Sequence, residues 1–166
     1  EVLALMKKRL PEGKLSLEAR QFPLDAACNP AMPPGASDGT GTRCAAAKAQ
    51  ICLEQAPDFW ELREKLCASQ STLTVDKVLA ISSSGSVSRS QLEQCMSDPE
   101  TTRKLVEDVE YAKQHDLHGT PLVVINGREA KAIAPFLYAL ILADGDASNP
   151  AFRVLPPPQP MQAHSH

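Results

Sequence analysis

The chain has 166 residues, which fits a single domain, and 43% of them are hydrophobic, enough for a sizeable core. Its formal net charge is −3 and its basic residues are scattered, so composition offers no electrostatic basis for binding nucleic acid. No apolar run reaches the ~18 residues that a membrane-spanning helix needs. The longest candidate, Ala132 to Ala143, is predicted to be a buried helix.

The first ten residues carry an apolar stripe at helical spacing, which predicts a helix over Glu1–Leu10 that stops before Pro11. No Ser, Thr, Asp or Asn precedes the stripe to cap this helix. We therefore interpret the chain as a fragment that enters the helix partway along. The alternative is a complete domain with a processed N-terminus.

A strand is predicted next, over Lys14–Phe22, because apolar and polar residues alternate there. Ala26–Gly41 is rich in Pro, Gly, Ser, Asn and Asp and is predicted to be a long loop. A loop of this length inside a compact domain usually has a function or a covalent tie.

Five helices are predicted after the loop: Thr42–Gln55, Asp58–Ser69, a helix capped by Thr74 that ends at Ser82, Ser88–Cys95 and Glu100–His115. Ser88 and Gln91 have the spacing of a capping box. Asp98 followed by Pro99 is the usual cap and first residue of a helix.

The stretch Gly119-Thr120-Pro121 leads into the apolar residues 122–125 and the pair Asn126-Gly127. A proline is tolerated at the first residue of a strand, and Asn-Gly favours a two-residue hairpin turn. We expect strands at Leu122–Asn126 and Arg128–Lys131, with a cis Thr120–Pro121 bond as a plausible feature. A last helix is predicted over Ile133–Ala143.

The order of strand, helical insertion, Thr-Pro, hairpin and helix resembles an α/β thioredoxin-like fold with a DsbA-like helical insertion, truncated at its N-terminus. Local matches make the chain especially similar to modules associated with vitamin K epoxide reductase family proteins: Phe22-Pro23-Leu24-Asp25, Cys28-Asn29, Cys44 with Cys52, and Asp58-Phe59-Trp60. The resemblance assigns residues 1–143 to the domain, 26–118 to its loop and insertion, and 144–166 to a Pro-rich tail.

This resemblance implies an extracytoplasmic thiol–disulfide oxidoreductase. Members react through a Cys-x-x-Cys at a helix N-terminus, but the five cysteines here are never three apart: Cys28, Cys44, Cys52, Cys67 and Cys95. We therefore expect no catalytic residue in this chain. The family pattern assigns substrate binding to Gly119, Thr120 and Pro121, through strand addition by an extended peptide. Two alternatives stay open: a redox-inactive thioredoxin-like peptide-binding module, and a small disulfide-stapled helical domain unrelated to thioredoxin.

The resemblance also implies partners and a compartment. Client proteins with cysteines would be substrates, and a quinone-linked membrane oxidoreductase, fused or separate, would recharge the enzyme. Localisation would be periplasmic or otherwise extracytoplasmic, with tethering through an upstream segment as one option. No cofactor is expected. No metal is expected either, because His115 and His118 around Asp116 lack a third ligand.

A truncated domain would lack one central strand. In the thioredoxin arrangement that strand lies between Leu15–Phe22 and Leu122–Asn126. We therefore expect a gap there or a pairing foreign to the family, whereas direct bonding of Leu17 to Val123 would argue against truncation.

Geometry limits the pairing of the cysteines. Cys44 and Cys52 stand eight residues apart on one predicted helix, ~12 Å along its axis, whereas a disulfide needs Cα atoms within ~7 Å. Cys28, in the loop, can fold back onto this helix. We favour Cys28–Cys44, worth ~3 kcal/mol in the chain-entropy model, over Cys28–Cys52. Either Cys67 or Cys95 is available to Cys52, one thiol must remain odd, and five free cysteines are the alternative.

Overall fold

The computed structural model describes residues 13, 15–115, 117, 119–146 and 148–150. The predicted helix Glu1–Leu10 lies outside these residues. The chain divides into two compact units, the first ending at His118 and the second beginning at Gly119. We call them the helical unit and the hairpin unit and describe each by itself.

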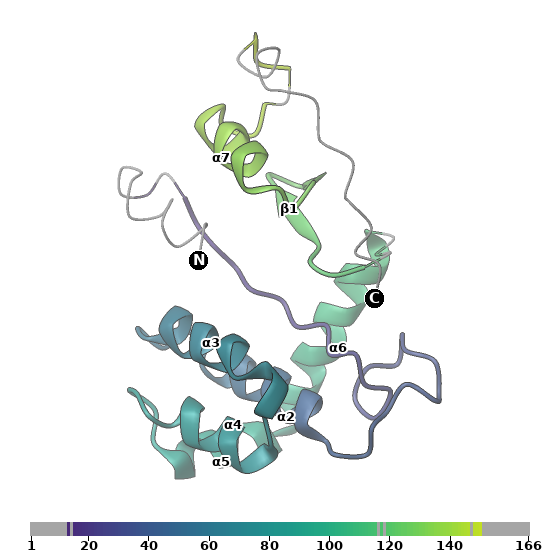
Figure 1. Cartoon of the computed structure of the whole chain (residues 1–166), viewed down its shortest axis with the longest axis vertical. Coiled ribbons are helices and arrows are strands. Elements are labelled where there is room, and N and C mark those ends of the chain that lie inside the picture. Colours follow the sequence, from purple (N-terminus) through teal and green to yellow (C-terminus); the bar gives the residue numbers. More distant parts are fainter. Residues whose placement is uncertain (1–12, 14, 116, 118, 147, 151–166) are drawn as a thin grey trace. The chain divides into compact units, whose positions relative to one another are not determined.

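The helical unit is built around one central helix, α2 (Figure 1). Its elements are α2 (Thr42–Cys52), α3 (Phe59–Ala68), the short 3-10 helix η1 (Gln70–Thr72), α4 (Val75–Ser82), α5 (Arg89–Ser97) and α6 (Pro99–Gln114). Each of the four other α-helices packs against α2. Alanines make up much of α2, and their small side chains let these neighbours approach it closely.

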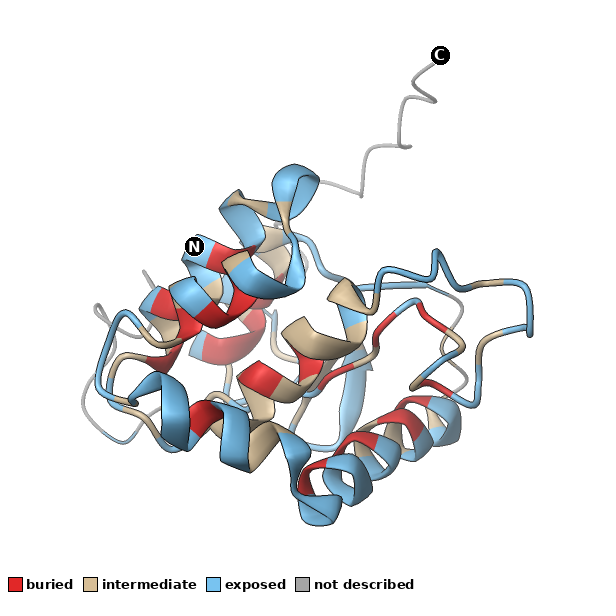
Figure 2. Cartoon of the chain, turned by 90° about the horizontal axis from the view of Figure 1, so that it is seen from below, coloured by how far each residue is buried: buried red, intermediate tan, exposed pale blue. Residues whose placement is uncertain are grey.

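The core of this unit lies where the helices face one another, and their buried faces turn inward in Figure 2. Leu53, Val78 and Leu92 are completely buried, and Leu62 is 1% exposed. Burying one such side chain stabilises the fold by about 2 kcal/mol. The helical arrangement therefore depends mainly on apolar packing across α2.

Side-chain caps set the helix starts that the sequence predicted. The Thr74 hydroxyl accepts from the Lys77 N–H of α4 at 3.2 Å. Ser88 forms the predicted capping box with Gln91 at the start of α5. Asp98 accepts from the Glu100 N–H at 2.8 Å, with Pro99 as the first residue of α6. These three predictions are confirmed.

The segment 15–22 is extended but forms no strand, so the prediction of a strand over Lys14–Phe22 is wrong. Burial does alternate along it as expected, and Ala19 packs against the helical core. Its Gln21 N–H donates to a carboxylate oxygen of Asp108 at 2.8 Å rather than to a neighbouring strand. A strand is defined by its partner, and within the described residues this segment belongs to no sheet.

The hairpin unit contains the one sheet found in the described part of the chain, β1 (Val123–Ile125) paired with β2 (Arg128–Ala130). The strands are antiparallel, with Val123 opposite Ala130. Asn126 and Gly127 have φ angles of 49° and 77°, the left-handed pair that a two-residue hairpin turn requires. The predicted hairpin is confirmed.

Helix α7 (Ala134–Leu142) follows the hairpin and is fastened to its turn. The Asn126 side-chain amide donates to the Asp144 carbonyl at 2.8 Å, and the Gly145 N–H donates back to the Leu140 carbonyl at 2.8 Å. Gly145 has φ 81°, and a Cβ there would lie 2.7 Å from Asn126 Nδ2. The close approach of turn and helix end therefore requires glycine at this position.

Candidate functional site

The predicted substrate-binding residues form an exposed loop directly before β1. Gly119, Thr120 and Pro121 are all exposed, and the Thr120–Pro121 peptide bond is cis. A Cβ built on Gly119 would meet no atom within 4 Å. Open backbone next to a strand is the kind of surface to which an extended peptide can pair through its main chain.

The cysteines form two disulfides, and both have Cα atoms 5.9 Å apart. Cys28 is bonded to Cys44, which is the pairing that the sequence favoured. Cys52 is bonded to Cys95, so Cys95 rather than Cys67 is its partner. Cys67 remains as an exposed free thiol. The expectation of one odd thiol is confirmed.

Two buried polar side chains shape the turn that carries Cys28. Asn29 is completely buried, donates to the Pro23 carbonyl at 2.8 Å and accepts from the Ala31 N–H at 2.9 Å. Asp25 is also completely buried, and one of its carboxylate oxygens accepts from the Ala27 N–H at 3.0 Å. Side-chain bonds to backbone two residues on are typical of Asp and Asn in turns. Sequence analysis did not assign these roles, although that rule points to them.

Arg43, in the first turn of α2, fastens both ends of the loop to the helix. Its guanidinium donates to the Leu24 carbonyl at 2.7 Å and lies 3.5 Å from the Asp38 carboxylate. Hydrogen bonds from the Thr40 hydroxyl and N–H lower the pKa of Asp38 and keep this carboxylate charged. The loop is therefore held by a disulfide and a few polar contacts.

The second disulfide lies among three helices and beside the hydroxyl of Thr101, a residue that is only 4% exposed. Thr101 Oγ1 donates to the Cys95 carbonyl at 2.7 Å. The same oxygen lies 3.5 Å from Cys95 Sγ and 3.8 Å from Cys52 Sγ. This disulfide joins the end of α2 to the last turn of α5, against the first turn of α6.

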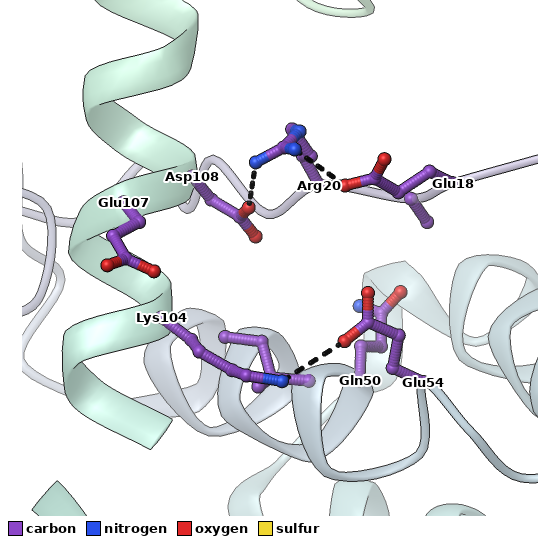
Figure 3. A pocket seen from close by; sticks show the side chains of 9 residues that line it. Glu18, Arg20, Gln50, Glu54, Lys104, Glu107 and Asp108 are labelled. Atoms are coloured by element: carbon purple, nitrogen blue, oxygen red, sulfur yellow. Dashed lines mark hydrogen bonds and ion pairs between the residues drawn. The ribbon is translucent and has the colours of Figure 1, made fainter. Parts of the chain in front are cut away.

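A charged cavity of about 150 Å³ lies between the segment 15–22, α2 and α6 (Figure 3). It is lined by Glu18, Ala19, Arg20, Gln50, Ile51, Glu54, Lys104, Glu107 and Asp108. Arg20 lies 2.7 Å from the Glu18 carboxylate and 3.2 Å from that of Asp108. Across the cavity, Lys104 lies 3.5 Å from Glu54. Most of the charged side chains that line this cavity are therefore already paired with one another.

Asp108 is the main anchor of the segment 15–22. Besides the Gln21 N–H it binds Arg20, whose guanidinium also lies 4.2 Å from the centre of the Tyr111 ring. Burial raises the pKa of the Asp108 carboxyl, while the Gln21 N–H and Arg20 act in the opposite direction. The cavity is therefore best explained as the place where this segment is fastened to α6.

No group of three or more His, Cys, Asp or Glu side chains that could hold a metal occurs in the described residues. His115 caps the end of α6, with its ring centre 4.6 Å from that of Tyr111. Asp116 and His118 lie outside the described residues. In the same part of the chain, no helix is long and apolar enough to cross a membrane.

Comparison with known families identifies the class of protein. A family model described as Thioredoxin matches residues 1–135, a range that includes every described helix up to α6 and the whole hairpin. The chain belongs to this thioredoxin family. Its helix-rich architecture with a small two-stranded sheet is consistent with an α/β thioredoxin-like fold. No curated protein and no solved structure matches it significantly.

Proposed function

We propose that this chain is part of an extracytoplasmic thiol–disulfide oxidoreductase that forms or exchanges disulfides in client proteins. Membership of the thioredoxin family supports the reaction class. The observation that carries the proposal is the exposed loop Gly119–Pro121 directly before β1, because it offers main-chain groups to a client peptide.

The loop would bind a client through backbone rather than side chains. An extended peptide lying beside Thr120 can exchange main-chain hydrogen bonds with it, and these depend little on peptide sequence. Gly119 leaves the approach free of side-chain atoms. Broad acceptance of clients is what a general disulfide-forming enzyme needs.

The redox dithiol of this enzyme would come from outside the 166 residues, which contain no Cys-x-x-Cys. Its first thiolate would form a mixed disulfide with the client, and its second thiol would resolve it. The similarity to DsbA-like modules associated with vitamin K epoxide reductase family proteins supports a quinone-linked membrane oxidoreductase, fused or separate, as the electron acceptor. The two disulfides favour an oxidising, extracytoplasmic compartment.

The alternative is a redox-inactive thioredoxin-like module that only binds peptides. The absence of a Cys-x-x-Cys from the sequence favours it. The coding sequence upstream of Glu1 separates the two functions: a Cys-x-x-Cys there supports the oxidoreductase, and any other pair in its place supports the binding module.

Peptide binding tests the groove itself. The full chain would be titrated with a short extended peptide whose cysteine is alkylated, followed by backbone amide NMR. T120P removes the Thr120 N–H and should weaken binding about tenfold, the value of one hydrogen bond. T120V keeps the N–H and should bind as the parent does.

Far-UV circular dichroism of both variants is the folding control for this titration. Equal peptide affinity of T120P and T120V, with both folded, would contradict the groove. Binding that shifts amides of the helical unit alone would do the same.

A further inference from the structure

The two disulfides lie at opposite ends of the same helix. Cys44 is the third residue of α2, and Cys52 is its last. The N-terminal end of a helix favours negative charge, and the C-terminal end disfavours it. A thiolate released by reduction is therefore stabilised at the N-terminal end of α2 and destabilised at the C-terminal end.

The start of α2 is open to an anion. Its N-cap is Gly41, which supplies no capping side chain, and no acidic residue stands in the first turn. The Thr42 N–H donates to the Thr40 hydroxyl at 3.2 Å, and Gly41 caps none of the backbone N–H groups that follow. A Cys44 thiolate would lie in the first turn of this 11-residue helix, in the setting that lowers the cost of ionising a thiol.

Cys28 also gains a partner when its bond to Cys44 opens. Its Sγ lies 3.8 Å from the Asp25 carbonyl oxygen, but a disulfide sulfur has no hydrogen to donate. The second carboxylate oxygen of Asp25 is buried in the same turn and has no hydrogen-bond partner. The Asp25 carbonyl already accepts from the Cys28 and Asn29 N–H groups at 3.2 and 2.9 Å, so the unpartnered carboxylate oxygen is the acceptor in this turn that remains for a reduced Cys28 thiol.

The second disulfide has the opposite surroundings. Cys52 ends α2, and Cys95 lies in the last turn of α5, so each sulfur belongs to the C-terminal end of a helix. The hydroxyl of Thr101 already donates its hydrogen to the Cys95 carbonyl. The first turn of α6 also lies against this disulfide, but the carboxylates of Asp98 and Glu100 already stand at that helix end and oppose a further negative charge.

We infer that Cys28–Cys44 is an exchangeable disulfide that accepts electrons from a dithiol peptide, with Cys44 as the leaving group, whereas Cys52–Cys95 is inert. A thiolate of the peptide attacks Cys28 Sγ, which forms a mixed disulfide and breaks the Cys28–Cys44 bond. The electron pair of that bond leaves on Cys44 Sγ as a thiolate.

The second step completes the exchange. The other thiol of the peptide loses its proton to water and attacks the peptide sulfur of the mixed disulfide. The bond to Cys28 breaks, and Cys28 leaves as a thiolate that takes up a proton. The peptide is oxidised to a disulfide by two electrons, and Cys28 and Cys44 are reduced. The inference goes beyond the proposed function and uses no residue of the Gly119–Pro121 loop.

Stepwise reduction of the full chain by dithiothreitol tests the difference between the two disulfides. Samples are quenched in acid and alkylated, and each cysteine is followed by peptide mass spectrometry. Cys28–Cys44 should open about fivefold faster than Cys52–Cys95, the upper range of a helix-end charge effect. Glutathione used in place of dithiothreitol should be found on Cys28 and not on Cys44.

A matched pair at Thr42 isolates the role of the helix end. Thr42 is the first residue of α2. T42E adds a negative charge that stabilises the helix but repels a thiolate at Cys44, while T42Q adds the same bulk without charge. Opening of Cys28–Cys44 should be about threefold slower in T42E than in T42Q, although T42E melts at an equal or higher temperature.

Equal opening rates of the two disulfides, glutathione on Cys44, or equal rates in T42E and T42Q would each overturn the inference. If T42E fails to fold, the opening rates of the two disulfides are compared within T42Q and within the parent. Equal rates of the two disulfides there would still overturn the inference. The T120P variant should leave both opening rates unchanged, so failure of the peptide groove and failure of this inference are distinguishable.

Discussion

At its first turn α2 meets a loop rich in Pro and Gly, and at its last residue it meets two other helices. A disulfide lies at each end. At the far end, completely buried Leu53 follows Cys52 directly, so the covalent bond adds to an existing core. At the near end, most of residues 30–41 are exposed, and the bond takes the place of a core. Cys52–Cys95 thus reinforces a packed core, whereas Cys28–Cys44 holds a loop that has almost no core of its own.

Removal of the disulfide in the helical core should have the largest effect. C52A/C95A, made in a C67S background, opens a connection between residues 43 apart, which costs about 4 kcal/mol of unfolding free energy in the chain-entropy model. Urea unfolding followed by circular dichroism measures this loss. The C67S chain is the control, since Cys67 is exposed and unpaired. A loss below about 1 kcal/mol would mean that packing alone holds the end of α2.

Removal of the loop disulfide should cost slightly less and act elsewhere. C28A/C44A, in the same background, opens a connection between residues 16 apart, worth about 3 kcal/mol. Limited proteolysis should become faster within 26–41, because only Arg43 and the turn contacts still hold the loop. Cleavage sites distributed over α3–α6 instead would show that the helices depend on this bond as well.

The smallest expected effect concerns Asp108, which ties the segment 15–22 to α6. Burial raises its pKa above the usual 3.8, so the folded protein holds this proton more tightly than the unfolded chain does. The corresponding stability is present below pH ~4 and is lost as pH rises through the raised pKa.

Substitution by Asn should remove this pH dependence. The difference in unfolding free energy between the parent and D108N should therefore change by less than about 1 kcal/mol between pH ~3 and ~6, falling for the parent as pH rises. Parent stability that rises relative to D108N over this range would contradict the assigned direction.

Local signals made the helices predictable. The start of α4 depends on Thr74, that of α5 on Ser88 with Gln91, and that of α6 on Asp98. Each of these caps is formed by residues within one turn, so the sequence contains the whole interaction. The strand predicted at Lys14–Phe22 failed for the complementary reason. Alternation of apolar residues describes its packing but supplies no partner for its backbone.

The site was predictable where short distances limited the choice. Cys28 and Cys44 are separated by one loop, whereas Cys52 and Cys95 lie on helices whose packing the sequence does not specify. The burial of Asp25 and of Thr101 could not be predicted from the sequence either. Polar residues are normally exposed, and only tertiary contacts bury these two.

The bond between the Asn126 side chain and the Asp144 carbonyl has a practical consequence for engineering. A residue inserted at Asn126-Gly127 would separate the hairpin turn from the end of α7. It would also disturb the close approach of Asn126 to Gly145. An epitope tag is better placed near Gly35, an exposed position of the Cys28–Cys44 loop where a Cβ would meet no atom within 4 Å.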